Sequence, residues 1–132
     1  MSALTRYFFD TVYYPRSTWH VVAWWERRRP SYNLAVGACG LVTLAVLALL
    51  GLLPPVAALA VLVPAYALAA NVCYSAGALV DLLARRVGGP DWAPIGPTLF
   101  RYGFAFSVGL TLLPIPMGLV GRAVQLLVAA VR

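Results

Sequence analysis

The feature that most constrains this chain is a pair of long uncharged segments separated by two prolines. Residues 34–53 carry no charge, and after Pro54 and Pro55 the sequence stays apolar over residues 56–80. A helix needs about 20 predominantly apolar residues, at a rise of 1.5 Å each, to cross a hydrocarbon core of about 30 Å. Both segments meet this requirement, so the sequence predicts two membrane spans joined as a tight hairpin.

The composition also indicates lipid as the solvent for most of the fold. The chain is 62% hydrophobic and only 11% charged, whereas about 25% of the residues in a soluble domain are charged. A soluble chain of this size buries a small fraction of its surface and has no core large enough to hide so many apolar side chains. We therefore expect one all-helical domain that crosses the membrane several times.

A third apolar helix is predicted over residues 98–113, after a Gly- and Pro-rich cytoplasmic loop over residues 81–97. In the C-terminal segment, residues 114–132, Arg122 and Gln125 share one helical face, which favours an amphipathic helix on the membrane surface. The alternative is a fourth span that returns through the membrane, so that the chain forms two hairpins. That alternative places Arg122 in the membrane, where a charge is costly.

Basic residues flank only one end of the predicted hairpin. Arg27, Arg28 and Arg29 precede the first span, Arg85 and Arg86 follow the second, and the turn between the spans is uncharged. Because Arg-rich flanks stay on the cytoplasmic side, we expect a cytoplasmic N-terminus and a multi-pass protein of a cell membrane, such as the bacterial inner membrane. Nucleic-acid binding is not expected, since it uses a contiguous solvated basic patch.

Residues 1–32 combine aromatic and Arg side chains, a composition typical of the membrane interface. Pro15 is expected to divide this segment, and Ser17 to cap a short helix that breaks at Pro30. The segment either anchors the chain in the headgroup layer or docks onto a partner protein. The residues assigned to this interfacial or docking role are Trp19, Trp24, Trp25, Arg27, Arg28 and Arg29.

Small residues recur at four-residue spacing in the predicted spans. Lipid supplies little hydrophobic drive for helices to associate, so close approach of small faces has to supply it. The predicted helix-packing positions are Ala65, Ala69, Cys73 and Gly77 in the second span and Gly103 and Ser107 in the third. The sequence leaves open whether these faces pack within the chain or against another subunit.

The second span also carries a polar face. The members of this intramembrane patch are Asn71, Tyr74, Ser75, Asp81 and Arg85. Polar groups at membrane depth are expensive unless they have partners. One interpretation is structural, with Asn71 bonding across helices and Asp81 pairing with Arg85 one turn later. The other is a site that binds an ion or a lipid headgroup.

Residues of the kinds that carry catalysis are few and scattered. His20 is the only histidine, and no group of His, Cys and carboxylate residues has metal-ligand spacing. Ser75 and Cys73 have no base at a recognisable spacing, and a nucleophile needs one. We therefore expect neither an enzyme nor a metal site nor a cofactor, although the composition is compatible with bound lipid.

These features favour a small accessory or scaffolding subunit of a larger membrane complex. Its expected partners are membrane lipids and either other membrane-protein subunits or further copies of itself. The alternative is a homo-oligomeric pore or membrane-disrupting effector, lined by the polar patch of the second span or by the face of Arg122 and Gln125. A pore needs polar residues through the full membrane thickness, and the outer halves of both spans have almost none.

Overall fold

The computed structural model describes residue 5, residues 17–89 and residues 93–131. The predicted aromatic segment before residue 17, with its boundary at Pro15, lies outside the described residues. The described helices of this chain are α2 (Thr18–Leu49), α3 (Val56–Gly88), α4 (Gly96–Leu112) and α5 (Pro114–Val131). No strand occurs in the described part, so the predicted all-helical class is confirmed there.

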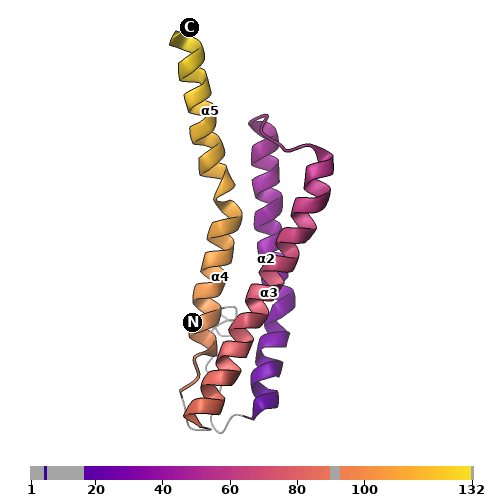
Figure 1. Cartoon of the computed structure of the whole chain (residues 1–132), viewed down its shortest axis with the longest axis vertical. Coiled ribbons are helices and arrows are strands. Elements are labelled where there is room, and N and C mark those ends of the chain that lie inside the picture. The colour runs from indigo at the N-terminus through magenta and orange to yellow at the C-terminus, as the bar shows by residue number, and fades with distance from the viewer. Residues whose placement is uncertain (1–4, 6–16, 90–92, 132) are drawn as a thin grey trace.

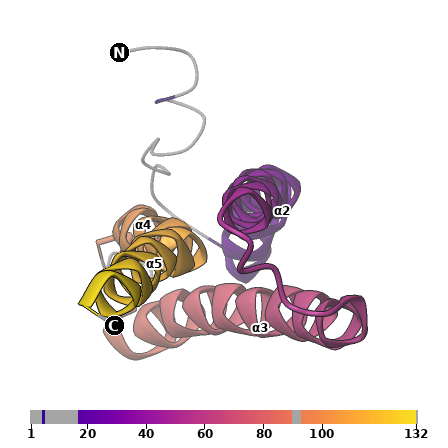
Figure 2. The same ribbon diagram turned by 90° about the horizontal axis from the view of Figure 1, so that it is seen from above.

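Three helical stretches of the described residues are long and apolar enough to cross a membrane. They are α2, α3 and the stretch Gly96–Val131 that α4 and α5 form together. In Figure 1, α2 and α3 form a hairpin, and α4 runs beside them with α5 continuing upward. Figure 2 shows α3 lying along one side of the pair made by α2 and α4. The architecture is that of a membrane-spanning helical bundle.

Helix α2 begins as predicted but does not end where the sequence suggests. The Ser17 hydroxyl accepts a hydrogen bond from the His20 backbone N–H at 3.3 Å, and the His20 ring accepts one from the Ser17 backbone N–H at 3.4 Å. This reciprocal capping box fixes the start of the helix. The predicted break at Pro30 is wrong, because α2 runs through it to Leu49.

Packing on both sides of Pro30 explains why the helix continues. Proline removes one backbone hydrogen bond and crowds the preceding turn. Trp25 and Tyr32, which flank the proline on the inner face of α2, are each only 2% exposed and hold the helix against its neighbours. The part of the basic aromatic segment from Thr18 onward and the first span as far as Leu49 are therefore one continuous helix of 32 residues.

The hairpin turn agrees with the sequence, whereas the following loop begins later than predicted. Gly51, in the turn, has φ +68, a left-handed conformation that glycine adopts at low cost. Helix α3 passes Pro64 without a break and ends at Gly88, so most of the first half of the predicted loop 81–97 is helical. The chain leaves the helix at Gly89, which has φ +85.

Helices α4 and α5 meet at Leu113 without a reversal of direction (Figure 1). Pro114 and Pro116 have no N–H to bond one turn back, so the junction interrupts the hydrogen-bond ladder but not the course of the chain. The described residues contain no second hairpin, in contrast to the four-span alternative. Helix α5 continues the line of α4 and does not lie across the end of the bundle.

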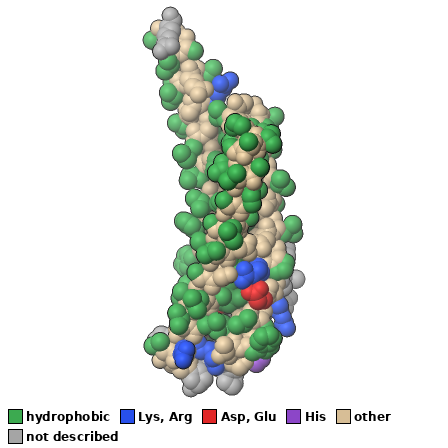
Figure 3. All heavy atoms as spheres, turned by 45° about the vertical axis from the view of Figure 1, so that its right-hand side comes forward, with side chains coloured by type: hydrophobic (Ala, Val, Ile, Leu, Met, Phe, Trp, Pro, Cys, Tyr) green, Lys and Arg blue, Asp and Glu red, His purple; other side chains and the backbone are tan. Residues whose placement is uncertain are grey.

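The buried core lies toward the end of the bundle at which α2 begins and α3 ends. Its members are Val21, Trp24, Trp25, Tyr32, Val36, Tyr74 and Phe100. Elsewhere most large apolar side chains are exposed, as expected for a surface that faces lipid. On the face drawn in Figure 3, hydrophobic side chains cover most of the length, and charged side chains gather mainly toward the lower end.

Candidate functional site

Asp81 joins three helices at the end of the bundle that holds the core. The Trp25 Nε1–H donates to Asp81 Oδ2 at 3.1 Å, and both residues are 2% exposed. Gly96, the first residue of α4, lies so close to the Asp81 carboxylate that a Cβ there would collide with it. The carboxylate therefore sits beside the N-terminal turn of α4, where the helix dipole favours negative charge.

Aromatic rings complete this end of the bundle. Trp24 packs edge-on against Trp25 with centroids 5.4 Å apart, and Trp25 packs against Tyr74 at 5.2 Å. The Tyr74 hydroxyl donates to the backbone carbonyl of Trp25, and the Arg28 guanidinium lies 3.9 Å from the centre of the Trp24 ring. We refer to Trp24, Trp25, Arg28, Tyr74, Asp81 and Phe100 as the aromatic cluster.

The aromatic cluster corrects part of the predicted interfacial surface. Trp24, Trp25 and Arg28 are buried contacts within the chain and offer no docking face. Trp19 remains outside, with 73% of its surface exposed, and Arg27 is exposed as well. The reason is the continuity of α2, which carries its inner face across Pro30 and brings these positions onto α3 and α4.

Asp81 and Arg85 contact other helices. Arg85 Nη1 donates to the Thr18 hydroxyl at 2.9 Å, at the first turn of α2. Asp81 accepts from Trp25, also on α2. The two residues lie one turn apart on α3, and each contributes to holding α3 against α2. This arrangement differs from the Asp81–Arg85 pairing expected from their spacing.

A second polar group lies further along the hairpin, between α2 and α3. We call it the amide network; its members are Glu26, Arg29, Asn33, Asn71 and Ser75. Arg29 binds Glu26 at 2.6 Å, the Ser75 hydroxyl at 3.2 Å and Asn71 Oδ1 at 3.4 Å. Asn33 and Asn71 exchange amide hydrogen bonds of 3.3 and 3.0 Å. Asn71 thus bonds across the hairpin, as the structural interpretation of this polar face expects.

Hydroxyl groups connect α4 to the hairpin. The Thr43 hydroxyl donates to the Thr111 backbone carbonyl at 2.7 Å, and the Tyr66 and Thr111 hydroxyls are hydrogen-bonded to each other. The Tyr32 and Ser107 hydroxyls are 2.9 Å apart. Ser107 is a predicted helix-packing position, and Thr111 follows it at the same four-residue spacing.

The predicted packing face of α3 is only partly in contact. A Cβ at Gly77 would lie 3.0 Å from the Trp25 ring, so Gly77 makes room for this side chain. Ala65, Ala69 and Cys73 are exposed instead. The inner face of α3 is displaced by one position and carries Tyr66, Ala70 and Tyr74. On α4, Ser107 is hydrogen-bonded and Gly103 is exposed.

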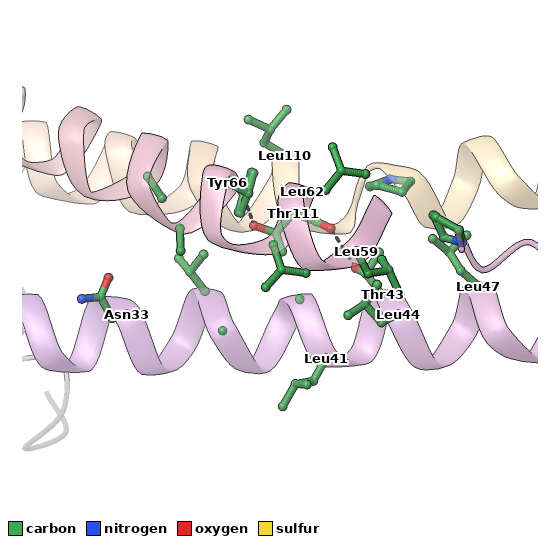
Figure 4. Close-up of a pocket in the computed structure, with 18 of the residues that line it drawn as sticks. Asn33, Leu41, Thr43, Leu44, Leu47, Leu59, Leu62, Tyr66, Leu110 and Thr111 are labelled. Atoms are coloured by element: carbon green, nitrogen blue, oxygen red, sulfur yellow. Dashed lines mark hydrogen bonds between the residues drawn. The ribbon is translucent and has the colours of Figure 1, made fainter. Parts of the chain in front are cut away.

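An apolar groove of about 560 Å³ lies between α2 and α3, with α4 and the start of α5 contributing to its wall (Figure 4). Its volume falls in the range of small-molecule sites, about 300–1,000 Å³. Along α2 it extends from Asn33 to Leu47, and along α3 from Leu59 to Asn71. The amide network lies at one end of the groove, and the bonded hydroxyls of Thr43, Tyr66 and Thr111 lie in its wall. We refer to it as the hairpin groove.

Among the described residues, helix α5 contacts the rest of the chain only near its start. Gly118 lies beside the side chains of Leu47, Leu50 and Leu52, at the level of the hairpin turn. No residue of α5 is buried. The segment 119–131 extends beyond the turn for roughly 20 Å at 1.5 Å per residue. Arg122 and Gln125 are hydrogen-bonded to each other at 3.2 Å, consistent with the shared face predicted for them.

Comparison with protein-family models, with curated proteins and with solved structures returned no match for this chain. Within residues 17–89 and 93–131 and at residue 5, no group of three or more His, Cys, Asp and Glu is placed to hold a metal ion. The candidate functional features of the described chain are the aromatic cluster, the amide network, the hairpin groove and α5.

Proposed function

We propose that this protein is a non-catalytic accessory or scaffolding subunit of a membrane complex, and that α5 is its main contact with a partner protein. The observation that carries the proposal is the apolar, unburied segment 119–131 beyond the level of the hairpin turn. A second support is the strip of exposed small residues on α3, which suits close approach of another helix.

The length of α5 is a further reason to expect a partner protein. Residues 34–53 alone match the thickness of the hydrocarbon core, about 30 Å, so the hairpin turn marks one edge of that core. The headgroup layer adds only about 5–8 Å on each side. A straight α5 extends roughly 20 Å beyond the turn, with Val120, Val124 and Leu127 exposed. A protein surface that covers these side chains removes their contact with water.

The polar residues favour a scaffold over a pore. Among the described residues, the side chains expected to line a pore in the second span bond to α2 or to α3 itself. Polar groups that bond to one another across helices in this way hold the helices together. We orient the chain with the Arg27–Arg29 end on the cytoplasmic side of the cell membrane, because basic flanks are retained there, and the hairpin turn outside.

A photo-crosslinking experiment tests the proposal. A photoreactive amino acid is placed at Val124 in α5, and the full chain is expressed in its native membrane. We expect a covalent adduct with a second polypeptide, identified by mass spectrometry. The matched control is Val42, an exposed α2 position within the bundle; adducts there should be with lipid.

Two results would contradict the scaffold. One is that Val124 forms adducts with lipid alone, which would place α5 on the membrane surface as an interfacial helix. The other is that the chain purifies in mild detergent only as a free monomer, with no copurifying protein. Ion flux through liposomes that contain the purified chain would support the pore instead.

A further inference from the structure

The hairpin groove has the shape and polarity of a site for one amphiphilic molecule with a polar group at one end. Apart from Pro54 in the hairpin turn, its walls come from the three described stretches that are apolar and long enough to cross a membrane. Apart from the hydroxyls already bonded within its wall, the polar groups at the groove are the amides of Asn33 and Asn71 at one end. In a membrane, such a groove opens to the acyl chains of the bilayer.

The polar end retains hydrogen-bond donors on two neighbouring nitrogens. Asn33 Nδ2 and Arg29 Nη1 both donate to the same atom, Asn71 Oδ1, at 3.3 and 3.4 Å. Each of these nitrogens carries two hydrogens, and the described residues provide a partner for one of them. Two spare N–H groups, one of them on the Arg29 guanidinium, are therefore carried by nitrogens that share Asn71 Oδ1 at the Asn33 end of the groove. Phosphate oxygens are strong acceptors for such a pair.

The dimensions match an acyl chain. From Asn33 to Leu47 the groove follows α2 for about 21 Å at 1.5 Å per residue. One leaflet contributes roughly half of the 30 Å hydrocarbon core, so a chain that enters at the Asn33 end reaches past the midplane. Gly37 and Gly40 line the groove where side chains would otherwise narrow it, and a Cβ at Gly37 meets nothing within 4 Å.

We propose that the hairpin groove binds one phospholipid, with an acyl chain between α2 and α3 and the phosphodiester on Arg29 and Asn33. The competing bilayer lipid is as apolar as the groove, so the hydrophobic effect does not select this site. Selectivity comes from the two spare donors and from the fit of the chain between the splayed helices. The bound lipid fills the space that the hairpin leaves open and stiffens the hairpin.

The test uses full-length protein in mild detergent and native mass spectrometry to count retained phospholipid. Gly37→Leu places a side chain in the groove, and Gly109→Leu adds the same side chain on α4 at a position where a Cβ meets nothing within 4 Å and which does not line the groove. Both changes raise helix propensity. We expect Gly37→Leu to lower retention of the lipid about tenfold, and Gly109→Leu to leave it unchanged.

The polar end is tested by Asn33→Asp, which keeps the size of the side chain but replaces the spare donor with a charge that repels phosphate. Retention should again fall several-fold. A phosphatidylethanolamine with a diazirine in one acyl chain provides a measurement without any variant. In the unmodified protein its adducts should map to the groove-lining positions of α2 and α3.

Three outcomes would overturn the proposal. Equal retention by the unmodified chain, Gly37→Leu and Gly109→Leu would show that the retained lipid lies elsewhere. Diazirine adducts spread evenly over the exposed apolar surface would indicate annular lipid only. Full retention of the lipid by Asn33→Asp would show that the phosphodiester does not bind at the Arg29 end.

Discussion

The two ends of this bundle are stabilised by different means. At the end where α2 begins, Trp25, Tyr74 and Asp81 are nearly inaccessible, Gly96 allows a contact too close for a Cβ, and Gly77 leaves room for the Trp25 ring. At the hairpin-turn end, α2 and α3 enclose the hairpin groove, and α5 has no buried residue. The first end therefore holds the helices together, and the second end leaves apolar side chains exposed.

The largest expected effect distinguishes a buried Trp from an exposed one. Trp25→Ala removes the ring that Gly77 accommodates and the donor to Asp81, so we expect a loss of about 3–5 kcal/mol in the free energy of unfolding, typical of a large aromatic deletion in a core. Trp19→Ala, at 73% exposure, should change it by less than about 0.5 kcal/mol. Steric trapping in bicelles measures both, and equal losses would contradict the comparison.

The next effect concerns the contact between α4 and Asp81. Gly96→Ala forces a Cβ against the carboxylate, and overpacking of this kind costs about 1–3 kcal/mol. Gly109→Ala on the same helix has open space around its Cβ and should gain up to about 1 kcal/mol from helix propensity. The measurement is the thermal midpoint in detergent, where the two variants should shift in opposite directions. A gain for Gly96→Ala would mean that α4 does not rest on Asp81.

A smaller effect is expected midway along the bundle. Thr43→Val removes the hydrogen bond to the Thr111 carbonyl while keeping the shape of the side chain. Interhelical hydrogen bonds in membrane proteins average about 0.6 kcal/mol, so the free energy of unfolding should fall by that amount. A loss of several kcal/mol would show that the tightly packed end of the bundle reaches further toward the hairpin turn than the contacts indicate.

The smallest effect is expected at the far end. Removal of residues 119–132 deletes no buried side chain of the described chain, so the thermal midpoint of the isolated protein should stay within the error of the measurement. Under the proposed function the same truncation abolishes copurification of the partner. A large fall in the midpoint would show that α5 belongs to the stabilising part of the bundle.

Much of the fold was predictable because the controlling quantities are local. The uncharged segments, the turn at Pro54 and Pro55 and the Ser17 cap depend on residues close together in sequence, and each agrees with the structure. The break at Pro30 was predicted from a local rule as well and is wrong. A single missing hydrogen bond was outweighed by contacts that Trp25 and Tyr32 make with α3 and α4.

The candidate site was less predictable. The sequence identified Asn71, Asp81 and Arg85 as polar groups that need partners, but their partners on α2 are 38 to 67 positions away in the chain. Spacing of three or four residues describes one helix, so it suggested an Asp81–Arg85 pair. It contains no information about the rotation of α3 relative to α2, which decides that Tyr66, Ala70 and Tyr74 face inward while Ala65, Ala69 and Cys73 face outward.

The sequence by itself determined that lipid surrounds most of the fold, that the fold is helical and where the hairpin lies. Hydropathy and the length of an apolar segment are sums over neighbouring residues. Only the tertiary structure decided that Trp25 meets Asp81, that α2 and α3 leave a groove between them, and that α5 continues past the turn. These features depend on how whole helices are rotated and displaced relative to one another, which is set by contacts between residues far apart in the chain.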